Sequence, residues 1–208
     1  MTAPRFTSLT ARAVVLDAAD VDTDQIIPAR FLKTTTKDDL AGALFADWRG
    51  RPGFPLDDPG NAGAQVLIAG PNFGCGSSRE HAAWALTAWG FRAVIAPGFA
   101  DIFRGNALGQ GLVPAAIPVD DHARLMAAVG RDPALPVTVD LDAQEVRWMC
   151  GGGAADGVCR AAFTVDPFAR RCLLDGVDEL GFLLGMDRAI AAHEADADEA
   201  RHPSGGAR

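Results

Sequence analysis

One segment of the 208-residue chain combines side chains suited to acid–base and anion-binding chemistry with glycines that let the backbone approach a ligand. It reads Asn-Phe-Gly-Cys-Gly-Ser-Ser-Arg-Glu-His over residues 72–81. It follows an apolar run at residues 65–69 and leads into an apolar helical pattern at residues 78–89. Open α/β sheets place their ligand sites at such strand-to-helix loops, and glycine permits the tight turns that they need. This segment is therefore the first candidate for a functional site.

Ser77 admits two interpretations on the residues alone. Ser77 and Glu80 have the S-x-x-E spacing of a capping box, which satisfies free N–H groups at a helix start. In the other interpretation, helix N–H groups and the neighbouring Arg79 stabilise negative charge, so that the serine binds a carboxylate or acts as an alkoxide base. A phosphate or a small dicarboxylate would be an equally suitable ligand for this loop and helix start. A P-loop, a dinucleotide fingerprint and a hydrolase nucleophile elbow are excluded, because residues that they require are absent.

A second segment, residues 17–34, is acidic at its start and basic towards its end. Its alternating aspartates imitate the start of a calcium loop. That reading is excluded because Gln25 stands where the loop needs glycine and Phe31 where it needs glutamate. A solvated acidic turn is the simplest interpretation. Arg30 and Lys33 add cations suited to an anionic ligand.

Composition narrows the class of protein. The chain has 19 basic and 27 acidic residues, a formal charge of −8, and its cations are scattered rather than gathered in a patch. We therefore expect no nucleic-acid partner. No stretch reaches the roughly 18 apolar residues of a membrane span, and residues 1–10 lack the apolar core of a signal peptide. We expect a cytoplasmic protein without a membrane partner.

The chain contains four cysteines, at positions 75, 150, 159 and 172, and none forms a C-x-x-C pair. Zinc and iron–sulfur sites normally contain such close pairs. A reducing compartment also keeps thiols free. The sequence therefore predicts four free thiols, with no metal and no cluster bound by this chain.

Apolar patterning predicts alternating strands and helices followed by antiparallel strands. The expected strands are 13–16, 65–69, 93–96, 112–117, 137–141, 145–148 and 162–165, and the expected helices are 78–89, 100–108, 120–129, 167–174 and 186–196. No linker separates two units. We expect an α/β fold with a mixed sheet in one domain, residues 1–196, followed by a disordered polar tail, residues 197–208.

Taken together, the two segments make the chain resemble the small-subunit family of bacterial 3-isopropylmalate dehydratases, within the aconitase superfamily. The matching stretches are residues 16–30, 72–81, 90–106 and 167–176, and the similarity extends from about residue 5 to residue 195. The resemblance implies a single swivelling β/β/α domain with mixed sheets, like the aconitase C-terminal domain. It also implies a hydro-lyase of leucine biosynthesis that interconverts 2- and 3-isopropylmalate by dehydration and rehydration.

The same resemblance implies a division of labour between two subunits. A separate large subunit would carry a [4Fe–4S] cluster, and the substrate would be a small dicarboxylate. Ser77 would be the catalytic base. The implied substrate-binding residues are Ser78, Arg79, Thr23, Asp24 and Lys33.

The fine specificity is open on the sequence. Lys33 stands in Phe-Leu-Lys-Thr, where many relatives have Tyr-Leu-Arg-Thr, so the charge is kept but the bidentate fork of arginine is lost. Sister activities, such as a homoaconitase or a citraconate-type dehydratase, are the nearest alternatives. A non-catalytic anion-binding module of the same fold is another.

Overall fold

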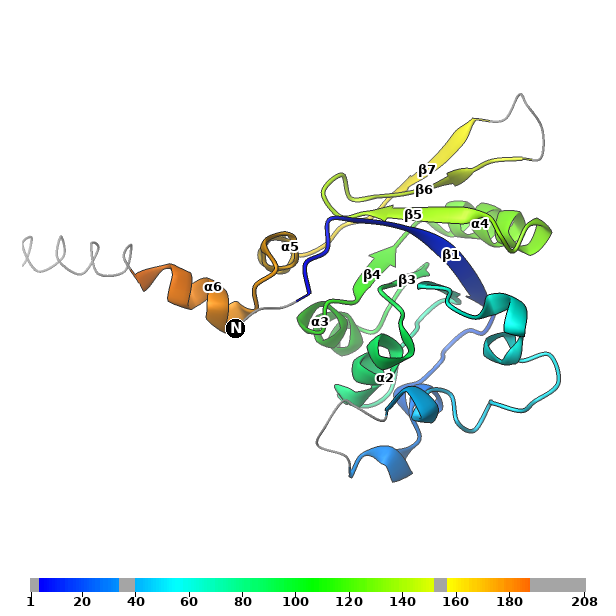
Figure 1. Cartoon of the computed structure of the whole chain (residues 1–208), viewed down its shortest axis with the longest axis horizontal. Coiled ribbons are helices and arrows are strands. Elements are labelled where there is room, and N and C mark those ends of the chain that lie inside the picture. Colours follow the sequence, from blue (N-terminus) through cyan, green and yellow to red (C-terminus); the bar gives the residue numbers. More distant parts are fainter. Residues whose placement is uncertain (1–3, 34–39, 152–156, 188–208) are drawn as a thin grey trace, which may run out of the picture.

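A seven-stranded mixed sheet forms the centre of the computed structural model, which describes residues 4–33, 40–151 and 157–187 (Figure 1). Its strand order is β4-β3-β2-β1-β5-β6-β7. The strands are β1 Ser8–Leu16, β2 Val66–Ala69, β3 Ala93–Ala96, β4 Val113–Ala116, β5 Pro136–Asp140, β6 Glu145–Met149 and β7 Val158–Ala162. The α-helices are α1 Thr23–Ile26, α2 His81–Trp89, α3 Asp101–Gly109, α4 Val119–Arg131, α5 Pro167–Asp175 and α6 Glu179–Gly185. Short 3-10 helices are η1 Ala29–Phe31, η2 Leu40–Ala43, η3 Pro55–Asp57 and η4 Pro59–Asn61.

Strand β1 joins a parallel half of the sheet to an antiparallel half. Its first part pairs antiparallel with β5 over residues 8–12, and its second part pairs parallel with β2 over residues 13–16. β2, β3 and β4 continue the parallel half, whereas β6 and β7 continue the antiparallel half. All four residues of β2 are buried, as expected for a parallel strand covered on both faces.

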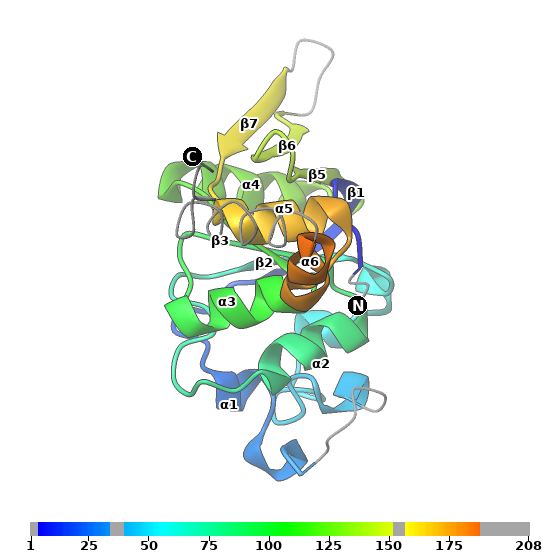
Figure 2. The same ribbon diagram turned by 90° about the vertical axis from the view of Figure 1, so that its left-hand side faces the viewer.

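Helices cover the two faces of the parallel half, so the side chains of β2 alternate between two apolar cores. Leu67 lies in a core shared with α2 and α3, and Ile68 in a core shared with α4 and α5. The second core also contains residues of β5 and β6, because the sheet curls around α4. Figure 2 shows α4 and α5 on one side of β2 and β3, and α2 and α3 on the other.

The structure confirms a mixed α/β domain and most of the predicted elements, but α1 was not predicted, α2 begins at His81 rather than at residue 78, and three further elements differ. β1 begins at Ser8 rather than residue 13, because its polar first part pairs with β5. The last strand spans Val158–Ala162 instead of 162–165, because it pairs with β6 in a hairpin. α6 was not predicted, since its two glycines lower helix propensity, but Asp178 caps its start.

Two predictions concern residues beyond those described. The helix expected at residues 186–196 lies mostly outside them, and so do the tail at residues 197–208 and the boundary at residue 196.

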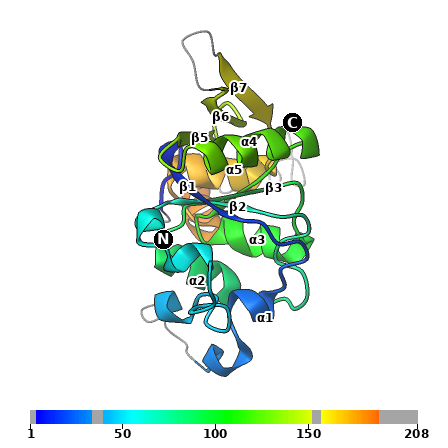
Figure 3. The same ribbon diagram turned by 90° about the vertical axis from the view of Figure 1, so that its right-hand side faces the viewer.

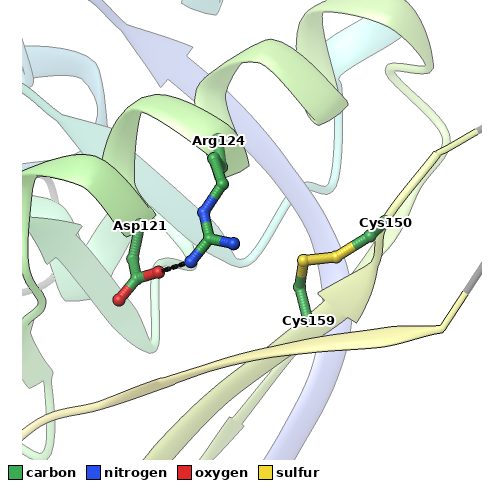
Figure 4. The surroundings of a disulfide bond; sticks show 4 residues. All are labelled: Asp121, Arg124, Cys150 and Cys159. Carbon is green, nitrogen blue, oxygen red and sulfur yellow. Dashed lines mark hydrogen bonds and ion pairs between the residues drawn. A yellow bond between two sulfur atoms is a disulfide. The ribbon is translucent and has the colours of Figure 1, made fainter.

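The prediction of free thiols is wrong for two of the four cysteines. Cys150 and Cys159 form a disulfide, with their Cα atoms 5.4 Å apart, whereas Cys75 and Cys172 are free. The two bonded cysteines are nine residues apart in sequence, but antiparallel pairing sets Cys159 opposite Trp148 and so brings it near Cys150. Figure 4 shows the disulfide beside the Asp121–Arg124 ion pair of α4.

Candidate active site

Loops that follow β1, β2 and β3 meet at one edge of the parallel half, because parallel strands all end on the same side of a sheet. The β2–α2 loop lies between the other two. On one side, Gly74 N–H donates to the Val21 carbonyl at 2.8 Å, and an isolated β-bridge joins Asp22 to Cys75. On the other side, a second bridge joins Phe73 to Phe99. The central loop is thus held by backbone hydrogen bonds to both of its neighbours.

Aromatic packing leaves room for only a glycine at position 74. Phe73 is fully buried, and its ring meets that of Phe103 of α3 edge-on, with centroids 5.3 Å apart. Gly74 has φ +78°, and a Cβ placed there would lie 2.2 Å from the Phe103 ring. Glycine therefore serves both the left-handed backbone and the close approach of α3.

A buried threonine holds the backbone of Ser77. Thr23, the first residue of α1, is 1% exposed. Its hydroxyl accepts a hydrogen bond from the Ser77 N–H at 3.2 Å and lies 3.4 Å from the Ser77 carbonyl oxygen, to which it can donate. The Thr23 N–H donates to the Cys75 carbonyl at 2.9 Å. The exposed side chain of Ser77 consequently extends from a backbone that α1 keeps in place.

The capping box proposed for Ser77 and Glu80 is wrong. Helix α2 begins at His81 with Glu80 as its N-cap, and no side-chain hydrogen bond caps it. The Ser77 N–H instead meets Thr23, so Ser77 belongs to the loop that precedes the helix. The capping box of this site is in α1, where Asp22 and Gln25 satisfy each other's N–H groups at 2.8 and 2.9 Å. The D-x-x-Q spacing was the sequence signal for it.

Arg79 and Asp24 form an ion pair between the β2–α2 loop and α1. The side chain of Arg79 is 23% exposed and that of Asp24 is 53% exposed, so the pair lies at the surface beside Ser77. One guanidinium nitrogen meets the carboxylate, and a guanidinium group has further N–H donors with which it can bind an anion.

The structure brings together five of the six predicted site residues. Thr23, Asp24, Ser77 and Arg79 are linked by the contacts above, and Ser78 adjoins them. Within the described residues, Lys33 is exposed and makes no hydrogen bond or ion pair with this group. Its neighbour Arg30 is occupied by an ion pair with Asp47 at 2.6 Å, which holds the pKa of that carboxyl below its usual range.

Asn106 of α3 is a contact that the sequence interpretation missed. Its side-chain amide donates to the Ser78 carbonyl at 3.3 Å. The sequence offered no periodic signal for this contact, because it joins residues 28 positions apart. The Ser77–Ser78 backbone is therefore held by α1 on one side and by α3 on the other.

Neither free cysteine is poised to act as a thiolate. Burial, reinforced by the charges of Asp22 and Asp20, raises the pKa of the Cys75 thiol, which donates to the Asp20 carbonyl at 3.3 Å. Burial likewise raises the pKa of Cys172.

In the described parts of the chain, no group of three or more His, Cys, Asp or Glu side chains could hold a metal ion. No described helix is long and apolar enough to cross a membrane.

Comparisons with known proteins identify the family of the chain. The model of the aconitase C-terminal domain family matches residues 3–120. A 3-isopropylmalate dehydratase small subunit of Parafrankia sp. is 51% identical over 190 residues, covering 91% of this chain and 93% of that protein. One from Anaeromyxobacter dehalogenans is 54% identical, covering 88% and 94%.

A solved structure shares the fold. The crystal structure of a 3-isopropylmalate dehydratase from Methanocaldococcus jannaschii matches with a TM-score of 0.64 and 30% identity, covering 90% of this chain and 99% of that one. The chain therefore belongs to the family of 3-isopropylmalate dehydratase small subunits, and its domain has the aconitase C-terminal fold.

Proposed function

We propose that the chain, together with a large subunit, interconverts 2-isopropylmalate and 3-isopropylmalate by removing water and adding it back, in the leucine biosynthesis of the cytoplasm. The observation that carries the proposal is the contact of the Ser77–Arg79 loop with Thr23 and Asp24. It joins the two segments on which the resemblance rests, in a chain about half identical to small subunits of that dehydratase.

Ser77 is proposed as the base that takes a proton from a substrate carbon. Such a proton is weakly acidic, so its removal needs a base held at the right place. A free serine hydroxyl is a poor base near neutral pH, and its alkoxide must be stabilised by donors or cations nearby. Preorganised donors of this kind contribute about 3–4 kcal/mol each to transition-state stabilisation. Arg79, two residues along the loop, supplies such a cation.

Arg79 and Ser78 are proposed to bind a substrate carboxylate, and Asp24 to orient the Arg79 guanidinium through their ion pair. Since Arg79 serves both the alkoxide and the substrate, its two contributions cannot simply be added. Thr23 is buried and bonded to the Ser77 backbone, which favours a positioning role over direct contact with substrate. Lys33 is proposed to contact substrate from its own segment, as the resemblance implies.

The residues of this chain do not fit an iron–sulfur cluster. Two cysteines form the disulfide, and the other two, Cys75 and Cys172, are far apart in sequence and have thiol pKa values raised by burial. The proposal assigns the [4Fe–4S] cluster to the large subunit, where it would supply the Lewis acid for the departing hydroxyl. The chain is acidic overall, and the proposal assigns the local attraction of an acidic substrate to Arg79 and Lys33 together.

Reconstitution with the large subunit tests the proposal. Turnover of both isopropylmalate isomers is expected from the pair, and none from the chain alone. Homoaconitate and citraconate-type substrates are assayed in parallel. If the pair has a higher kcat/KM for one of them than for isopropylmalate, that compound becomes the proposed substrate. Binding of dicarboxylates without any turnover by the pair would instead identify an anion-binding module.

A further inference from the structure

The last described helix, α6, buries none of its own residues. Its leucines at positions 180, 183 and 184 are 50%, 54% and 56% exposed. Phe182 contacts the Phe168 ring of α5 edge-on, with ring centroids 5.0 Å apart. Figure 1 shows α6 extending away from the sheet. Contiguous exposed apolar side chains of this kind mark an interaction surface.

A cavity of about 530 Å³ lies between α3, α5 and the start of α6, and Leu180 is the exposed leucine that lines it. Apolar side chains from all three helices line it, among them Leu108, Phe168 and Leu180. Gly105 and Gly109 of α3 also line it, and nothing lies within 4 Å of a Cβ placed on either. The cavity is therefore a largely apolar pocket with room for side chains of a binding partner.

The rim of this cavity is acidic. Asp166, Asp178 and Glu179 all line it. Together with Asp175, they add to the burial that raises the pKa of Cys172. A second copy docked about a two-fold axis would bring these carboxylates against themselves, which is unfavourable. Charge complementarity instead requires a partner with basic residues around an apolar anchor.

Helix α3 connects this surface to the candidate active site. Asn106 bonds the Ser78 carbonyl, and the adjacent Gly105 lines the cavity. A partner that completes the site around Ser77 must approach α3, and a contact that continues along α3 reaches the cavity. Figure 2 shows α3 and α6 on the face of the molecule that is turned towards the viewer.

We propose that the exposed leucines of α6 and the cavity between α3, α5 and α6 form a docking surface for the large subunit of the dehydratase. The segment that binds there places apolar side chains in the cavity and arginine or lysine against its acidic rim. This inference rests on the proposed function, which supplies the large subunit as partner.

The test measures the Kd between the full chain and the purified large subunit by calorimetry. Replacing both leucines, Leu183→Glu with Leu184→Glu, is expected to raise Kd at least about tenfold, the loss typical of truncated interface anchors. Glu179→Lys is expected to raise Kd about three- to tenfold, with a larger effect at low salt. The matched control is Val119→Glu on α4, at a residue that is 64% exposed, and it should leave Kd unchanged. Far-UV circular dichroism and Tm check that each variant folds.

Equal Kd values for wild type, double variant and control would overturn the docking surface while leaving the proposed function intact. A double variant that loses self-association but keeps its Kd for the large subunit would assign the surface to a second copy, and would also overturn it. A wild-type chain that neither binds nor activates the large subunit would overturn the proposed function, and this inference with it.

Discussion

The two halves of the sheet are built differently and are expected to do different work. The parallel half ends in the loops that hold Thr23, Ser77 and Arg79. The antiparallel half ends in a hairpin closed by the Cys150–Cys159 disulfide. Figures 2 and 3 show α1 and the β6–β7 hairpin at opposite ends of the molecule.

The difference follows from the connections between strands. Parallel strands need long crossovers, so β1, β2 and β3 each release a loop at the same edge, and polar side chains from distant segments gather there. In the antiparallel half, β5, β6 and β7 follow one another along the chain and pair in that order, which brings together residues that are close in sequence. Changes at the first edge should therefore alter turnover, whereas changes in the second half should alter stability alone.

The largest effect is expected from Ser77→Ala. Loss of the proposed base should lower kcat of the reconstituted pair about 10²- to 10⁴-fold, the usual contribution of a placed acid or base. Tm should not change, because Ser77 is exposed. Ser8→Ala in β1, also exposed, is the control from the antiparallel pairing and should keep full activity. Near-normal turnover of Ser77→Ala would remove Ser77 as the base.

Gly74→Ala should lower the free energy of unfolding by about 2–4 kcal/mol, because left-handed strain and overpacking against Phe103 both contribute. Gly53→Ala separates the two causes. Gly53 has the same φ of +78° but nothing within 4 Å of the added Cβ, so only the strain of about 1–2 kcal/mol applies. Urea denaturation measures both losses, and equal losses would contradict the packing argument.

Replacing both Cys150 and Cys159 by serine should lower the free energy of unfolding by about 2–3 kcal/mol, through the entropy of the short loop that the bond closes. Turnover should stay at the wild-type level, since the hairpin is remote from Ser77. Titration of the unfolded, unreduced wild type should find two reactive thiols, those of Cys75 and Cys172. Four reactive thiols would show that the disulfide does not form in solution.

Thr23→Val keeps the shape of the side chain but removes the hydroxyl that holds the Ser77 backbone. An unsatisfied hydrogen-bonding group costs about 1–3 kcal/mol, so kcat should fall about tenfold as Ser77 loses its position. In the antiparallel pairing, Thr10→Val removes a hydroxyl contact with Thr138 at 2.9 Å and should not affect kcat. Equal activity of the two variants would contradict the positioning role.

The smallest effect concerns His122 of α4, which donates from Nε2 to the carbonyl of Ala69 at the end of β2, at 2.8 Å. Burial lowers its pKa below the usual 6.5, although the Ala69 hydrogen bond and Asp17 act in the opposite direction. The unfolded chain therefore binds a proton more readily than the folded chain. The free energy of unfolding should fall as the pH drops below about 6.5, by at most about 1.4 kcal/mol per pH unit.

The variant His122→Gln should lose this pH dependence of the free energy of unfolding, measured between pH 5.5 and 7.5. An unchanged dependence of the free energy of unfolding on pH would exclude His122 as its source.

The sequence by itself determined the alternation of strands and helices, the family, and the segments that carry the site. Buried strands such as residues 66–69 are continuous apolar runs. The glycine-rich loop that follows them lacks the residues of the other common ligand-binding loops, so its motif points to one family. These features are local, so periodicity and composition are sufficient to predict them.

Only the tertiary structure decided which side chains meet. Ser77 is bonded by Thr23 rather than capping α2, Ser78 is held by Asn106, and Cys150 pairs with Cys159. Each of these contacts depends on strand register or on loops converging at one sheet edge. Strand register and loop positions are decided by the packing of the whole domain. They cannot be predicted from the sequence alone, because hydrogen bonds between distant segments leave no periodic pattern in the chain.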